Sequence, residues 1–162
     1  MIVFLLLGAA VVLWLLSWLR ADLTIAAANV NGLISGNQYA TGSSASALTA
    51  GQVCYQNTNG LWAPAQSNSA QINSGTTQCA IALNSCPGAG QPFQGWKSGT
   101  LYTGNTNMTV GQTYVVSQNA GGIAPNTDLA TGLYVTVLGV AISATQLQNT
   151  SGGIFATGIT HA

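Results

Sequence analysis

Alternation of apolar and polar residues, interrupted by glycine, is the dominant pattern from residue 51 to the end of the sequence. A period of two is typical of β-strands that bury one face. The pattern predicts strands at 51–56, 61–66 and 78–84, two short strands within 93–104, a strand and a short return within 110–125, a strand pair in 132–143 and a last strand in 152–160. About eight to ten short strands at this spacing predict an all-β fold, either a small glycine-rich β-barrel or a β-sandwich.

The run 132–143, GLYVTVLGVAIS, has apolar residues on both faces of its predicted strands. Two alternating sets fill these faces: Leu133, Val135 and Val137, and Tyr134, Thr136 and Leu138. A strand that is apolar on both faces is buried on both, so we expect one face against the protein's own core and the other against a second surface. Gly139 is predicted to allow a β-bulge or a barrel corner.

Two turns are predicted next to these strands. The segment 57–60, NTNG, is expected to close a hairpin between the first two strands, because Asn and Gly adopt positive φ. Pro64 is expected either to end the second of these strands or to place it at a sheet edge. Lys97 lies in GWKSG and is expected at the tip of a hairpin within 93–104.

The N-terminal segment 1–20, MIVFLLLGAAVVLWLLSWLR, predicts an apolar helix. As a helix, residues 1–19 are roughly 28 Å long, close to the hydrocarbon thickness of a bilayer. Trp14, Trp18 and Arg20 lie near its end, where interfacial side chains are favoured. A membrane anchor is the first interpretation. A helix buried in a protein assembly and a cleaved signal peptide are the alternatives.

The segment 21–50 is rich in small residues, and glycines interrupt it. It offers little to bury, so we expect an extended arm or linker, with DLTIAAANV as a short strand or part of that arm. The domain organisation predicted from the sequence is therefore an apolar helix at 1–20, an arm at 21–50 and an all-β domain at 51–162.

Charged side chains are scarce. Arg20, Lys97, Asp22 and Asp128 make up 2% of the 162 residues, and the formal net charge is zero. Soluble domains ordinarily have about 25% charged residues. Nucleic-acid binding depends on Lys and Arg contacts to phosphates, so we expect no nucleic-acid partner. A neutral surface does little to prevent association, which suits a subunit that packs against other subunits.

Groups that carry out chemistry are equally few. His161 is the single histidine, and Asp22 and Asp128 are the two carboxylates. A paired-carboxylate site and a Ser-His-Asp site are both disfavoured, and no phosphate-binding or dinucleotide motif is present. Three cysteines and one distant histidine lack the spacing of a zinc site. We therefore expect no enzyme activity, no cofactor and no metal.

The cysteines Cys54, Cys79 and Cys86 leave two interpretations open. Cys79 and Cys86 flank AIALNS and are predicted to meet across a hairpin if the compartment is oxidising. The other interpretation is that the cysteines are small apolar residues, most of them buried.

Turn-and-strand motifs follow one another in the order TAGQVCY (49–55), GLWAPA (60–65), CAIALN (79–84), GQPF (90–93), SGTL (98–101), VGQTYVVS (110–117), GGIAP (121–125) and DLATGLYVTVLGVAISAT (128–145). Over about residues 21–162 this order resembles a family of tailed-phage virion proteins, the capsid decoration and head-fibre-like proteins. The apolar segment 1–20 is not part of the resemblance. The resemblance implies an all-β body without catalytic residues, which binds the major capsid protein or other virion proteins, often as a homotrimer.

We therefore expect a structural virion protein that decorates or cements a phage capsid by neutral contacts, on the capsid surface or a vertex. Membrane contact through 1–20 accompanies this expectation if that segment is an anchor. Four aromatic residues are expected either to fill the core or to anchor an interface: Trp62, Trp96, Tyr102 and Tyr134. The alternative is a membrane-anchored cell-surface adhesin or glycan-binding β module, with exposed Trp and Tyr around a concave site.

Overall fold

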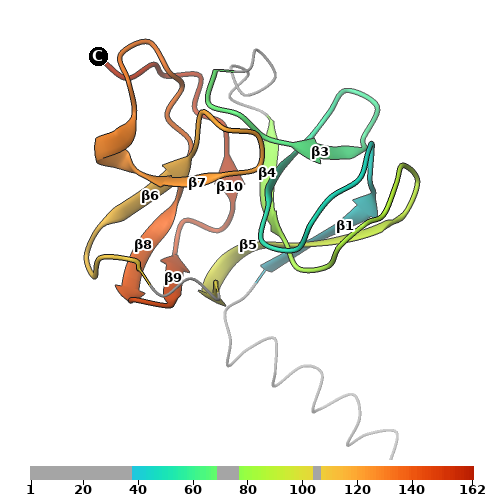
Figure 1. Ribbon diagram of the computed structural model, residues 1–162, viewed down its shortest axis with the longest axis horizontal. Helices are drawn as coiled ribbons and strands as arrows, with labels where there is room; N and C mark the ends of the chain where they lie inside the picture. Colours follow the sequence, from blue (N-terminus) through green and yellow to red (C-terminus); the bar gives the residue numbers. More distant parts are fainter. Residues whose placement is uncertain (1–37, 69–76, 104–106) are drawn as a thin grey trace, which may run out of the picture. The chain divides into compact units, whose positions relative to one another are not determined.

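The computed structural model describes residues 38–68, 77–103 and 107–162, and these form one all-β unit, as predicted (Figure 1). Its strands are β1 (Gln38–Ser43), β2 (Val53–Gln56), β3 (Trp62–Pro64), β4 (Gln78–Ala82), β5 (Pro92–Tyr102), β6 (Thr113–Val116), β7 (Ile123–Pro125), β8 (Val137–Ser143), β9 (Gln146–Asn149) and β10 (Ile154–Phe155). A 3-10 turn, η2 (Asn126–Asp128), follows β7. The helix predicted at 1–20 lies outside the described residues. Among the residues described, no helix has the length and hydropathy needed to cross a bilayer.

The strands form one curled antiparallel sheet with the shape of a half-barrel (Figure 1). The strand order is β3-β2-β4-β5-β9-β8-β6-β7, with β1 added to β5 and β10 added to β4. The two ends of this order approach each other at the β6–β7 turn. There the amide of Val53 donates to the carbonyl of Gly121 at 2.9 Å, and the amide of Gly121 donates to Ala65 at 2.8 Å. These bonds hold the sheet in its curled form.

Strand β5 replaces the two short strands and the hairpin tip predicted in 93–104. Its first half pairs with β1 and β4, and its second half, from Gly99 to Tyr102, pairs with β9. Gly99 has φ of 95°, which bends the strand without reversing it. The prediction was wrong because partners on both halves keep KSG extended, and Lys97 lies within β5 rather than at a tip.

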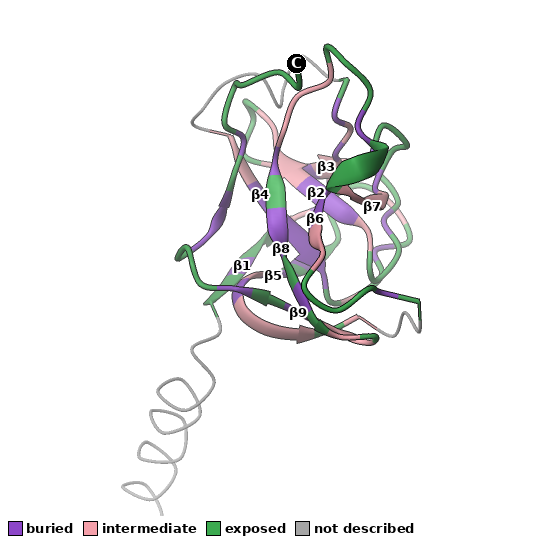
Figure 2. Ribbon diagram, turned by 90° about the vertical axis from the view of Figure 1, so that its left-hand side faces the viewer, coloured by how far each residue is buried: buried purple, intermediate pink, exposed green. Residues whose placement is uncertain are grey.

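Two hydrophobic cores lie on opposite faces of β2 and β4, and their buried residues are purple in Figure 2. The first core consists of Val53, Ala65, Cys79, Ile81, Trp96, Met108, Tyr114, Val116, Leu138, Ala141, Leu147, Ile154 and Ala156. The second core consists of Ala40, Leu48, Cys54, Trp62, Ala80, Ala82, Cys86 and Phe93. Neighbouring residues of β4 alternate between them, with Cys79 and Ile81 in the first core and Ala80 and Ala82 in the second. This accounts for the unbroken apolar character of the strand.

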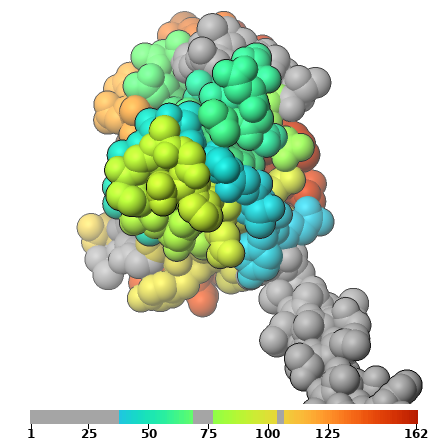
Figure 3. Space-filling model, turned by 90° about the vertical axis from the view of Figure 1, so that its right-hand side faces the viewer, coloured from blue at the N-terminus to red at the C-terminus, as the bar shows by residue number. Residues whose placement is uncertain are grey.

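Strand β1 lies in the segment 21–50, where we expected an arm or linker. It pairs with β5 from Gln38 opposite Ser98 to Ser43 opposite Pro92. Figure 3 shows the β1 segment (blue) directly beside the chain that leads into β5 (yellow-green). The described part of this segment therefore belongs to the β domain, because Ala40 and Leu48 contribute side chains to the second core.

The hairpin predicted around 57–60 is confirmed. Strands β2 and β3 pair with Gln56 opposite Trp62, and Gly60 in the turn has φ of 76°. Strand β3, which contains Pro64, lies at one end of the strand order, as the proline predicted.

The run 132–143 contains one strand, β8, rather than the strand pair predicted. Thr136 still accepts from the amide of Val116 at 3.1 Å, but Tyr134 forms an isolated bridge with Thr160 near the C-terminus instead of extending β8. The bulge predicted at Gly139 is present, since the pairing of β6 with β8 shifts register between Tyr114 and Val115. The last strand is also shorter than predicted, with β10 reduced to Ile154–Phe155.

Candidate interaction surfaces

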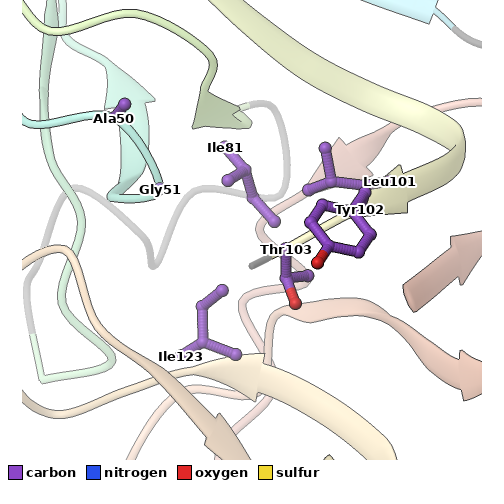
Figure 4. Close-up of a pocket in the computed structure, with 7 residues that line it drawn as sticks. All are labelled: Ala50, Gly51, Ile81, Leu101, Tyr102, Thr103 and Ile123. Carbon is purple, nitrogen blue, oxygen red and sulfur yellow. The ribbon is translucent and has the colours of Figure 1, made fainter. Parts of the chain in front are cut away.

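An apolar pocket of about 290 Å³ opens between β4, β5 and β7. It is lined by Ala50, Gly51, Ile81, Leu101, Tyr102, Thr103 and Ile123 (Figure 4). Four stretches of chain that are far apart in the sequence build it, namely the turn before β2, strand β4, the end of β5 and the start of β7. The curl of the half-barrel brings them together.

The floor of this pocket is continuous with the first core. Ile81 is buried in that core, and Leu101 and Ile123 are half-buried and pack against it. At the rim, Tyr102 is 68% exposed. The hydroxyl of Thr103 donates to the carbonyl of Thr145 at 3.1 Å, which satisfies it within the chain. The pocket therefore presents aliphatic surface with one exposed aromatic ring beside it.

A second hollow of about 320 Å³ lies on the other half of the domain. It is lined by Tyr39 and Thr41 of β1, by Gln94 of β5 and by Leu83, which follows β4. Sequence reasoning missed this hollow because it treated β1 as part of an arm. The signal that could have found it is the alternation in QYAT, where Ala40 is buried between two exposed neighbours.

A third surface is the side of β8 that faces away from the first core. Val137, Val140 and Ile142 are exposed there, by 43%, 39% and 42% of their surface. Leu138 and Ala141 point to the opposite side and are buried. We call the three exposed residues the β8 outer face.

The four aromatic residues singled out from the sequence lie in different environments. Trp62 is buried in the second core, and Trp96 is buried in the first. Tyr134 is half-buried and packs against the first core. Tyr102 is the member of this set that lines the pocket with its ring exposed. The structure therefore does not gather the four residues into one site.

Two charged side chains fall within the described residues. Lys97 lies on β5, where its Nζ atom donates to Oε1 of Gln78 at 3.3 Å and lies 5.6 Å from the centre of the Phe155 ring. Asp128 lies in η2 and accepts from the hydroxyl of Thr127 at 3.4 Å. Neither residue lines the two hollows or belongs to the β8 outer face. Within the described segments, no group of three or more potential metal ligands is present.

The three cysteines are free thiols, and all are buried. The disulfide considered between Cys79 and Cys86 is absent, because these residues lie in different cores on opposite faces of β4. Burial raises the pKa of Cys54 to about 12, with smaller contributions from Cys86 and Cys79, and burial raises the pKa of Cys79 to about 12. Thiols held in this way are poor nucleophiles, since the thiolate is the reactive form.

Comparisons of the chain with protein-family models, with curated proteins and with solved structures found no match.

Proposed function

We propose that this protein is a structural virion protein that decorates or cements a phage capsid through neutral, non-catalytic contacts with the major capsid protein or other virion proteins. The observation that carries this proposal is the apolar pocket with the exposed ring of Tyr102 at its rim. The order of turn-and-strand motifs over residues 21–162 supports the same assignment by resemblance.

The pocket would bind an apolar side chain of the capsid partner. Ile81, Leu101 and Ile123 provide the aliphatic walls, and burial of such surface is favourable without any fixed hydrogen-bond geometry. The ring of Tyr102 would close over the inserted side chain, because aromatic residues with few rotatable bonds contribute large contact area at low entropic cost. Such a contact adds no charge to the interface.

The test begins with gold-labelled antibody against the protein in a lysate of the producing cells, examined by electron microscopy. Gold on regular icosahedral particles supports the proposal. Gold confined to envelope fragments overturns it. Purified particles with and without the protein are then heated, and we expect lower resistance to heat in the particles that lack it.

Two point variants, tested for retention on the same particles, show whether the pocket makes the contact with the capsid. Tyr102→Ala should lower the amount of protein retained on the particles. Ile159→Ala should leave retention unchanged, because Ile159 is equally exposed, at 65% against 68%, and does not line the pocket. Equal retention of both variants would place the contact elsewhere on the surface.

The second candidate is a membrane-anchored adhesin or glycan-binding β module. The exposed ring of Tyr102 beside a concave surface favours it, since such a ring can pack against the apolar face of a sugar. Retention of the purified protein on immobilised envelope polysaccharide, lost in Tyr102→Ala, would support this candidate over the capsid role.

A further inference from the structure

The β domain contains one turn-and-strand arrangement twice. In each case a Thr-x-Gly-Gln turn leads into a strand, in LTAGQVCY (48–55) and in MTVGQTYV (108–115). The turn glycines Gly51 and Gly111 have φ of 89° and 83°. The amide of Gly51 donates to the carbonyl of Ala82 at 2.7 Å, and the amide of Gly111 donates to the carbonyl of Ala141 at 2.8 Å. Ala82 and Ala141 therefore occupy equivalent positions.

The strands after these turns repeat the same pairing. Strand β2 pairs with β3 through Cys54 opposite Pro64, and β6 pairs with β7 through Tyr114 opposite Pro125. Strand β2 also pairs with β4, as β6 does with β8. The sheet order accordingly runs β3-β2-β4-β5 from one end and β7-β6-β8-β9 from the other.

The equivalence extends to the first strand of each copy. The two equivalent alanines lie opposite Gly95 of β5 and Leu147 of β9. On its other side, Gly95 lies opposite Ala40 of β1, and Leu147 lies opposite Leu101 in the second half of β5. The domain is therefore a duplication of one five-stranded unit, β1 to β5 and β5 to β9, in which each half of β5 belongs to a different unit (Figure 1).

Both units present the same kinds of side chain beside this row of paired residues. Each unit has one tyrosine, one threonine, one glutamine and one aliphatic residue there. The first surface consists of Tyr39, Thr41, Leu83 and Gln94, which line the second hollow, and the second surface consists of Thr100, Tyr102, Ile142 and Gln146.

The pairing places these residues at matching positions. Thr41 lies opposite Gln94, and Tyr102 lies opposite Gln146, so the members of each pair project from the same face. The aliphatic residues follow the two equivalent alanines and are exposed to the same extent, Leu83 by 40% and Ile142 by 42%. The tyrosine and the threonine exchange places along the first strand of the unit, and the tyrosine is well exposed in both.

We propose that the two surfaces bind two neighbouring copies of one capsid subunit, so that each chain binds the shell bivalently. This inference rests on the capsid role proposed above. The duplication selects the partner, because a chain that presents one set of side chains twice matches a partner that offers one site twice, as a symmetric assembly of identical subunits does. Two modest contacts joined in one chain give a higher overall affinity than either contact alone.

The test measures binding of the full chain to purified particles that lack it, over a range of concentrations. Leu83→Lys and Ile142→Lys each disrupt one surface, and neither residue lines the pocket at Tyr102. Each variant should lower the apparent affinity by about tenfold or more. Each should also bind at about twice the number of chains per particle at saturation, because a chain with one working surface occupies one site instead of two.

The control is Ile159→Lys, which should bind as the unchanged chain does, since Ile159 is 65% exposed and belongs to neither surface. Thermal melts check that the variants fold. Where a lysine variant melts early, Gln94→Arg and Gln146→Arg test the same two surfaces.

The outcomes separate bivalent binding from the capsid role. Unchanged affinity in either surface variant, or the same number of chains at saturation for the unchanged protein and both variants, would overturn bivalent binding and leave the capsid role in place. A variant with both lysines that binds as tightly as either single variant would do the same. Absence of binding by the unchanged chain would overturn the capsid role and, with it, the bivalent contact.

Discussion

The indole ring of Trp62 stacks on the ring of Phe93, with 4.7 Å between the ring centroids and 19° between the ring planes. Trp62 begins β3 and Phe93 lies near the start of β5, so the stack joins two strands that do not pair with each other. The indole N–H also donates to the carbonyl of Thr41 in β1 at 3.4 Å. One side chain thus connects three strands around the second core.

Removal of one ring of this stack should lower the free energy of unfolding. Trp62→Ala removes a fully buried aromatic side chain and leaves a cavity, so we expect a loss of about 3–5 kcal/mol in the free energy of unfolding. Urea denaturation followed by fluorescence measures it. Tyr102→Ala is the control, with an expected change within about 0.5 kcal/mol, because its ring is exposed. Similar losses in the two variants would contradict the placement of Trp62.

Gly95 is required by close packing. A Cβ atom there would lie 2.7 Å from Cβ of Ala80 and 2.7 Å from Cζ of Phe93. Gly95→Ala should therefore destabilise the fold by about 1–3 kcal/mol through overpacking. Gly88→Ala is the matched control, since nothing lies within 4 Å of its added Cβ atom. A thermal melt of Gly95→Ala that coincides with that of Gly88→Ala would refute the close approach of β4 and β5.

The buried thiols predict how stability depends on pH. Unfolded thiols lose their protons from about pH 8.5, whereas the folded state keeps the protons of Cys54 and Cys79 until about pH 12. Between these values the folded state binds more protons, so the free energy of unfolding should fall as pH rises. Urea midpoints at about pH 7.5 and pH 10.5 measure this loss. The loss should be smaller in Cys54→Ala, and an equal loss would assign it to other groups.

The proposed association with capsid particles should depend weakly on salt. The pocket lining includes no charged residue, so few ion pairs are available to be screened. Retention of the protein on purified particles should change little between about 0.05 and 0.5 M salt. A steep loss over this range would indicate contacts made by charged residues. Lys97→Ala is the control. It removes one of the two charges in the described residues, so its salt dependence shows whether that charge takes part in the contact.

Strands with period-two alternation between clear turns could be predicted from the sequence. The β2–β3 hairpin followed from NTNG and Pro64, and the all-β fold followed from the repeated spacing. The long strand β5 could not be predicted, because KSG is also a good turn sequence and only its partners β1, β4 and β9 keep it extended. The strand predicted at residues 132–135 was wrong for the converse reason, since these residues pair with the C-terminal segment instead of extending β8.

The candidate surfaces were predictable only in part. Aromatic residues could be named from the sequence, but their exposure depends on which face of a strand meets a core, and that choice is made by distant residues. Trp96 enters the first core opposite Ile81, whereas Tyr102 lies on the same strand beyond the bend at Gly99. The pocket itself has no sequence signature, because its walls come from four separate stretches of the chain.

Strands β2 and β4 supply alternate side chains to both cores, with Val53 and Cys54 as neighbours on opposite sides. Loss of packing on one side therefore disturbs the strands that form the other side. We therefore expect the two cores to lose their packing together, so the β domain should behave as a single cooperative unit in denaturation. For the same reason it should resist division into two separately folding fragments, wherever the chain is cut.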